Sequence, residues 1–206
     1  MPRKTGWTMR TFALAAAVAA GLMASGGPAR AQAGGEAVRT LYATLMEVMR
    51  SGPSLGARGR YARIEPVIAR VFDLPLMTRL AVGPSWASLN EAQKQQVTQA
   101  FERYLAAVYA ERFDSYSGER LEVTGTQAST IGTIVTSRIV KSTGEPVQIN
   151  YLMQGGQIAD IYVNGTISEL ATRRSEFSSI MRSQGVDGLI AALNGKAAAL
   201  GAARTS

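Results

Sequence analysis

The sequence predicts an α+β fold in which helices pack around a twisted, four-stranded antiparallel meander sheet that encloses an apolar cavity. Two observations carry the α+β prediction. Apolar residues recur every three or four positions before residue 113 and after residue 165, which is the spacing of amphipathic helices. Between about residues 120 and 164 the interval falls to two, and Thr, Val and Ile become frequent, as in strands. We expect one domain over residues 32–200.

Residues 1–31 stand apart from this fold as an export signal. A basic start precedes an apolar run over 11–23, and the letters PARA at 28–31 supply a small-residue end. This pattern is typical of a cleaved signal peptide, with a mature protein that begins near Gln32 and resides in the periplasm. An uncleaved anchor is the alternative, although the run is shorter than the roughly 20 residues that cross a bilayer.

The first helix is expected over about residues 36–50, where apolar side chains share one stripe. The segment SGPSLGARGR at 51–60 breaks it. Pro66, a residue favoured in the first turn, predicts a second short helix that ends at Phe72. A further helical turn over 73–80 completes this region.

The longest helix is expected over about residues 91–113, capped by Ser88 or Asn90. The four strands follow at 121–128, 130–141, 146–154 and 157–164. Between the last two, Gly155-Gly156 predicts a two-residue hairpin that needs positive φ.

This hairpin pairs Met153 with Ile158 and Tyr151 with Asp160. The same register places Ile161 on the face opposite to Tyr151. Because apolar residues occupy both faces, we expect the sheet to be covered on both sides, or covered on one and lining a cavity on the other.

Helical spacing returns after Gly165, with Leu170 and Phe177 on one stripe. Gly185 breaks that helix, and a last helix is expected over about 187–200. Its end is expected to fray from Ala197, and residues 201–206 are expected to form a flexible tail.

Composition narrows the function. The 206 residues include no His and no Cys, which excludes a Ser-His-Asp triad, a thiol nucleophile and imidazole or thiolate metal sites. The net charge of +7 falls to about +3 once the four basic residues of the leader are removed, and the arginines are scattered. We therefore expect no nucleic-acid binding, no metal and no cofactor.

Two stretches together resemble the MlaC / toluene-tolerance family of periplasmic lipid-binding proteins, over roughly residues 36–195. The first runs from FDLPLMTRLAVGPSW into the long helix, and the second is the strand, turn and helix IYVNGTISELATRRSEF. The matching positions are Phe72, Asp73, Met77, Leu80, Gly83, Trp86, Gln93, Phe101, Leu105, Tyr109, Tyr116, Asp160, Gly165, Ser168, Arg174 and Phe177.

Within the family, the wording GTISELATRRSEF is closest to the hopanoid-associated HpnM branch. One residue more than the phospholipid-carrier branch separates Gly165 from Arg174, and the Trp usual before the Asp-bearing strand is missing from QGGQIAD. The resemblance implies a non-enzymatic carrier that holds a hopanoid or a phospholipid in its cavity. It would exchange that cargo with inner-membrane transporter components, make transient membrane contact and deliver towards the outer membrane.

The residues alone leave open whether the large apolar side chains form an ordinary core or a cavity wall, and the resemblance implies the wall. The expected wall residues are Phe72, Trp86, Phe101, Leu105, Val108, Tyr109, Ile149, Tyr151, Met153, Ile161, Phe177 and Met181. Arg174 and Asp160 are expected to pair with each other or with a neighbouring group, or, for Arg174, to meet a lipid head group.

Two alternatives stay open. A small enzyme could use Asp160 or Glu122 with Tyr151 as an acid/base pair, although an Asp beside a Tyr more often forms a structural hydrogen bond. A protein that scaffolds a transporter would have a packed interior with no void above about 300 Å³.

Overall fold

The computed structural model describes residues 27–202, with side chains from Gly34 onward. The predicted signal peptide therefore lies mostly outside the described residues. Helix α1 spans Gly27–Val71 and bends at Gly56, whose φ of 61° is left-handed. The break predicted over 51–60 is thus a kink at one residue. The predicted helix start at Pro66 is wrong, because Pro66 lies inside α1 between the buried Ile64 and Ile68.

Two short elements and one long helix follow. Helix α2 spans Leu74–Val82, and Asp73 caps it by accepting a hydrogen bond from Leu76 N at 3.1 Å. A 3₁₀ turn, η1, spans Gly83–Ser88, and helix α3 spans Glu91–Arg112. Asn90 caps α3 in a reciprocal capping box with Gln93, so the prediction of a cap at this position is confirmed.

The sheet is a meander with strand order β1-β2-β3-β4-β5, all neighbours antiparallel. Its strands are Arg120–Ser129, Gly132–Val140, Pro146–Gln154, Gln157–Val163 and Ile167–Ser168. The first four match the prediction, and the two-residue β5 was not predicted. Gly155 and Gly156 have φ values of 59° and 90°, which confirms the tight hairpin between β3 and β4.

A β-bulge corrects the predicted register of that hairpin. Met153 pairs with Ile158 as predicted, but Leu152 pairs with Asp160, which leaves Ala159 unpaired. Tyr151 therefore faces Ile161 and not Asp160. Because a bulge shifts the alternation by one residue, Ile161 shares a face with Tyr151, and Asp160 points to the other side.

Helix α4 spans Glu169–Ala199 and bends at Gly185, where φ is 68°, so the predicted break is confirmed. Ala197 is buried, which contradicts fraying from this residue. The helix ends in a Schellman motif in which Gly201 N donates to Ala198 O and Ala202 N donates to Ala197 O. The predicted flexible tail therefore does not include residues 201 and 202, and residues 203–206 lie outside the described part.

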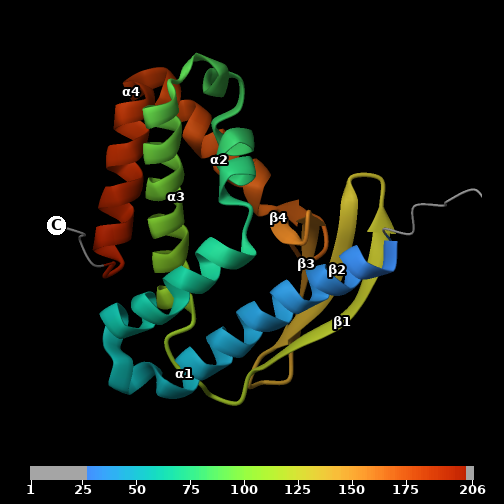
Figure 1. The fold of residues 1–206 in the computed structure, drawn as a ribbon. Coiled ribbons are helices and arrows are strands. Elements are labelled where there is room, and N and C mark those ends of the chain that lie inside the picture. The colour runs from blue at the N-terminus through green and yellow to red at the C-terminus, as the bar shows by residue number, and fades with distance from the viewer. Residues whose placement is uncertain (1–26, 203–206) are drawn as a thin grey trace, which may run out of the picture.

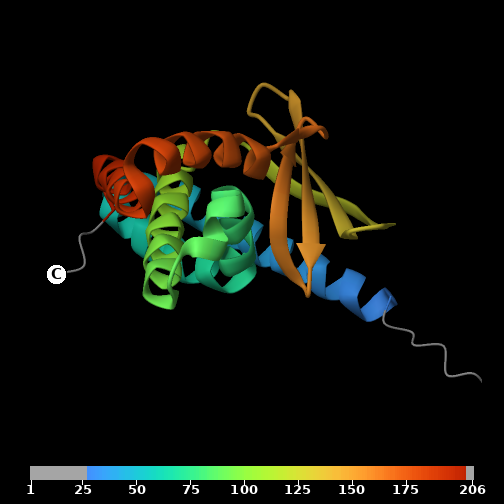
Figure 2. The ribbon, with the colours of Figure 1, turned by 90° about the horizontal axis from the view of Figure 1, so that it is seen from above.

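Helices α2, α3 and α4 gather on one side of the sheet, and α1 runs across β1, β2 and β4 (Figures 1 and 2). The face of the sheet that meets the helices carries Val135, Ser137 and Tyr151, all buried, whereas Arg138 and Gln148 on the other face are exposed. Coverage around these positions is thus one-sided, whereas Leu152 and Asp160, which pair on the other face, are buried as well. Among residues 27–202, none of the helices combines the length and hydropathy that a membrane crossing requires.

Candidate functional site

A pocket of about 510 Å³ lies between the covered face of the sheet and the helices α2, α3 and α4. Seventeen side chains form its wall, and only four of them are charged. They are Met77, Phe101, Leu105, Val108, Tyr109, Arg112, Phe113, Ile139, Lys141, Val147, Ile149, Tyr151, Ile161, Val163, Glu169, Leu170 and Arg173. The size lies within the roughly 300–1,000 Å³ typical of small-molecule sites, and the wall is suited to hydrocarbon.

The structure places seven of the twelve expected wall residues in this wall, namely Phe101, Leu105, Val108, Tyr109, Ile149, Tyr151 and Ile161. The other five are not part of it. Phe72 and Phe177 are fully buried behind the wall and contact it edge to face, Phe72 against Tyr109 and Phe177 against Phe101.

Met153, Met181 and Trp86 also lie away from the pocket. Met153 is buried beside Gly34 of α1, and Met181 is half-buried in α4. Trp86 borders a separate depression, where Lys94 Nζ lies 5.9 Å from its ring centroid. For these side chains the ordinary packing interpretation fits the structure.

Tyr151 belongs to a chain of buried hydroxyl groups. Its hydroxyl lies 3.3 Å from that of Tyr42 on α1, which lies 2.6 Å from Ser137 Oγ on β2. Ser137 donates to the carbonyl oxygen of Ile149 at 2.5 Å. Burial is the main cause that raises the pKa of Tyr42 and Tyr151, so both phenols keep their hydrogen at neutral pH.

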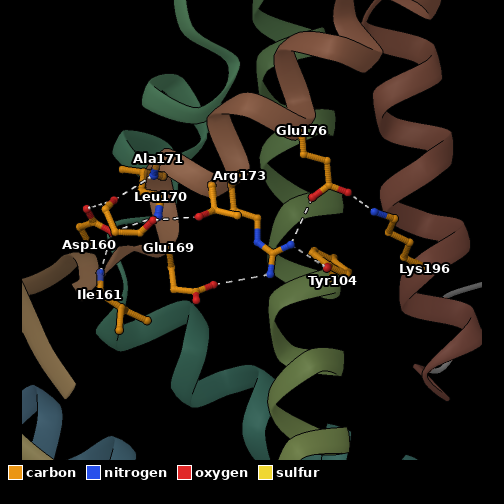
Figure 3. Close-up of polar contacts among 11 residues, drawn as sticks. Tyr104, Asp160, Ile161, Glu169, Leu170, Ala171, Arg173, Glu176 and Lys196 are labelled. Atoms are coloured by element: carbon orange, nitrogen blue, oxygen red, sulfur yellow. Dashed lines mark hydrogen bonds and ion pairs between the residues drawn. The ribbon is translucent and has the colours of Figure 1, made fainter. Parts of the chain in front are cut away.

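Arg173, on the first turns of α4, is the charged wall residue with the most contacts (Figure 3). Its Nη1 donates to Tyr104 Oη at 3.0 Å and to Glu176 Oε2 at 3.2 Å, and its Nη2 lies 3.8 Å from Glu169 Oε2. Its guanidinium also lies 5.2 Å from the Tyr104 ring centroid. These partners offset the unfavourable position of a cation near a helix N-terminus.

Lys196 joins the same network from the last part of α4, where it pairs with Glu176 and lies 5.8 Å from the Tyr104 ring centroid. Burial opposes ionisation of Glu176, but the attraction of Lys196 and Arg173 outweighs it and lowers its pKa. The network therefore holds both parts of α4 against α3.

Arg174, the expected head-group residue, does not lie at the pocket. It is exposed, its Nε lies near Gly83 of η1, and it forms no ion pair within residues 34–202. Helix phase could have identified Arg173 instead, because it follows Leu170 by three residues and precedes Phe177 by four, on the inward stripe.

Asp160 is buried and forms the connection between β4 and α4 (Figure 3). Its Oδ1 accepts from Ile161 N at 2.7 Å and from Leu170 N at 3.1 Å, and its Oδ2 accepts from Ser168 Oγ at 2.6 Å. Ser168 Oγ in turn accepts from Ala171 N. The carboxylate thus satisfies the free Leu170 amide at the start of α4, and neither Arg174 nor Tyr151 forms a hydrogen bond or ion pair with it.

The proposed acid/base pairs do not form. Glu122 is engaged by Arg138 and Arg120 on the edge of the sheet, and these two arginines lower its pKa. Asp160 and Tyr151 point to opposite faces. Within residues 34–202 no cluster of three or more carboxylates is arranged to hold a metal ion.

Comparison with known proteins relates this geometry to a family. In a solved structure, a phospholipid-binding protein from Ralstonia solanacearum in complex with a phospholipid has a similar fold, with a TM-score of 0.68 and 21% identity. The match covers 81% of this chain and 98% of that one. The family model described as MlaC protein matches residues 39–195, which is most of the chain. The chain therefore belongs to the MlaC family.

Proposed function

We propose that this protein is a periplasmic lipid carrier that holds the hydrocarbon part of its cargo in the pocket between the sheet and α2–α4. The observation that carries the proposal is the pocket itself, about 510 Å³ in volume with thirteen uncharged and largely apolar wall residues. A void of this size argues against a protein that only scaffolds a transporter. Family membership and the phospholipid in the Ralstonia structure support a binding or transport role over an enzymatic one.

The polar end of the cargo is proposed to lie near the charged wall residues. Arg112 and Lys141 are exposed, whereas Arg173 is largely buried and fixed by Glu169 and Glu176. These groups provide three positive charges against one carboxylate on the wall itself. Such a border is suited to an anionic or hydroxyl-rich head group next to an apolar interior.

The cargo is proposed to be a hopanoid in preference to a glycerophospholipid, because GTISELATRRSEF resembles the HpnM branch. The protein would receive or deliver it at inner-membrane transporter components and shuttle it towards the outer membrane. Cell fractionation with an antibody against the mature chain tests the periplasmic location, and cytosolic recovery would contradict it.

Lipid extraction tests the central proposal. The protein purified from its native membrane-containing host should release lipid into organic solvent, and mass spectrometry should identify it as hopanoid or phospholipid. Absence of lipid, together with no uptake from vesicles of host lipid, would overturn the proposal. Arg173→Gln should lower the amount of bound lipid, whereas the matched neighbour variant Arg174→Gln should not.

A further inference from the structure

Two phenol side chains, Tyr109 of α3 and Tyr151 of β3, stand among the apolar residues of the pocket wall. A hydrocarbon cargo offers nothing to these oxygen atoms. Phenylalanine would present the same ring without a hydroxyl group that must be removed from water. The hydrogen-bonding capacity that the two hydroxyls leave unused is therefore where a polar group of the cargo would bind.

The hydrogen of Tyr151 is committed away from the pocket. A carbonyl oxygen accepts and cannot donate, so the Ser137 hydroxyl must donate its single hydrogen to Ile149 O. Tyr42 must then donate to Ser137, and Tyr151 must donate to Tyr42. This one-way chain leaves Tyr151 Oη with unused lone pairs and no hydrogen to offer, so Tyr151 is an acceptor only.

Tyr109 differs from Tyr151 because its side chain is half-buried and its hydroxyl forms no hydrogen bond within residues 34–202. Its ring is held in place, 5.7 Å from the stacked ring of Phe113 and 6.0 Å from the perpendicular ring of Phe72. Burial raises its pKa, so the hydroxyl keeps its hydrogen. Tyr109 can therefore both donate and accept.

We infer that Tyr109 and Tyr151 form a subsite for an alcohol group that the cargo buries in the pocket together with its hydrocarbon. This inference rests on the proposed carrier function and names a chemical class within it. An alcohol donates to Tyr151 Oη and accepts from the Tyr109 hydroxyl, which uses both groups. A ketone, ester or ether can only accept, and so it engages Tyr109 alone.

A matched set of fatty acids tests the subsite. Octadecanoic acid is compared with its keto and hydroxy derivatives, with the substituent moved stepwise along the chain, by displacement of a fluorescent fatty acid from delipidated full-length mature protein. At the best substituent position, the hydroxy acid should bind more tightly than the keto acid, and the keto acid more tightly than the parent. Each step should be roughly three- to tenfold, the contribution of one hydrogen bond.

Two conservative variants assign the bonds. Tyr151→Phe should bring the hydroxy acid down to the affinity of the keto acid, and Tyr109→Phe should bring the keto acid down to that of the parent. Tyr116→Phe, which alters an exposed phenol outside the pocket, should leave the order unchanged. Thermal unfolding of each variant confirms that it is folded.

The outcomes separate the two proposals. Equal affinity for all three acids at every position overturns the alcohol subsite and leaves the carrier intact. The subsite is also overturned, with the carrier again intact, if the preference persists in Tyr151→Phe and Tyr109→Phe. Failure of the wild-type protein to bind any of the acids, combined with absence of extracted lipid, overturns the carrier function itself.

Discussion

Replacement of Asp160 by Asn should weaken the fold without changing what the pocket binds. The carboxylate is 6% exposed and accepts three hydrogen bonds, from Ile161 N, Leu170 N and Ser168 Oγ. Asn is nearly the same size, so the substitution removes charge and one acceptor while it leaves the packing in place. Any loss therefore measures the polar connection between β4 and α4.

The expected magnitude follows from these three bonds. Hydrogen bonds to an ionised group contribute roughly 1.5–3 kcal/mol each, and neutral ones about 1 kcal/mol. The Asn amide oxygen keeps the bonds from Ile161 and Leu170 in their weaker neutral form, and the bond from Ser168 loses its acceptor. With the lower value for each charged bond, we expect a loss of about 3 kcal/mol in the free energy of unfolding, which lowers Tm by roughly 6–12 °C.

Urea unfolding followed by circular dichroism measures this loss. Asp114→Asn, at an exposed loop position, is the matched control and should change the unfolding free energy by less than about 0.5 kcal/mol. Lipid bound per folded molecule should be the same in both variants. If Asp160→Asn proved as stable as the control, or lost lipid while it kept its stability, the structural role assigned to Asp160 would be refuted.

Three further predictions concern the pocket, the ion-pair network and α1. Val108→Trp should reduce the amount of extracted lipid, because it adds bulk to the pocket wall, and should cost about 1–3 kcal/mol in stability. The control Gln96→Trp, on the outside of α3, should leave the amount of extracted lipid unchanged. Equal amounts of lipid in the two variants would contradict the assigned wall. The cationic partners of Glu176 lower its pKa, so its contribution to stability should be complete above the ordinary value of 4.5 and should disappear as pH falls through the lowered pKa. When the free energy of unfolding is measured at decreasing pH, Glu176→Gln should therefore lose less stability than the wild-type protein. Gly52→Ala should lower the free energy of unfolding by more than about 2 kcal/mol, because a Cβ at this position collides with a backbone oxygen of the loop after α3. Gly195 has open space around it, so Gly195→Ala should raise the free energy of unfolding by up to about 1 kcal/mol. Thermal unfolding measures both changes.

The parts of the fold that depend on local chemistry were predictable from the sequence. Asn90 caps α3, Gly155-Gly156 turns the hairpin and Gly185 interrupts α4, each because a short-range hydrogen bond or a left-handed φ requires that residue. The predicted helix start at Pro66 was wrong because tertiary packing overrode the preference of proline for the first turn of a helix. Ile64 and Ile68 on either side are fully buried, and their burial keeps the chain helical through the proline.

The pocket was less predictable, since it depends on how distant elements meet. Sequence identified apolar residues of α3 and of the sheet that line it, but could not separate Phe101 in the wall from Phe177 directly behind it. The inward position of Arg173 could have been predicted from its helical spacing to Leu170 and Phe177. The hydroxyl chain from Tyr151 to Ser137 could not, because it joins residues on α1, β2 and β3 that are up to 109 positions apart.

The bulge at Ala159 determines which side chains of β4 face the pocket, because one extra residue shifts the alternation of side chains between the two faces of the sheet. In an uninterrupted ladder, the pairing of Met153 with Ile158 would direct Asp160 towards the ligand space and turn Ile161 away from it. The unpaired Ala159 reverses that order. Ile158, directly before the bulge, is held in place because its carbonyl oxygen accepts a hydrogen bond from Asp73 N at 2.9 Å. Whether a carboxylate or a hydrocarbon side chain of β4 faces the pocket is thus encoded in how many residues the strand contains at this point, as well as in which residues they are.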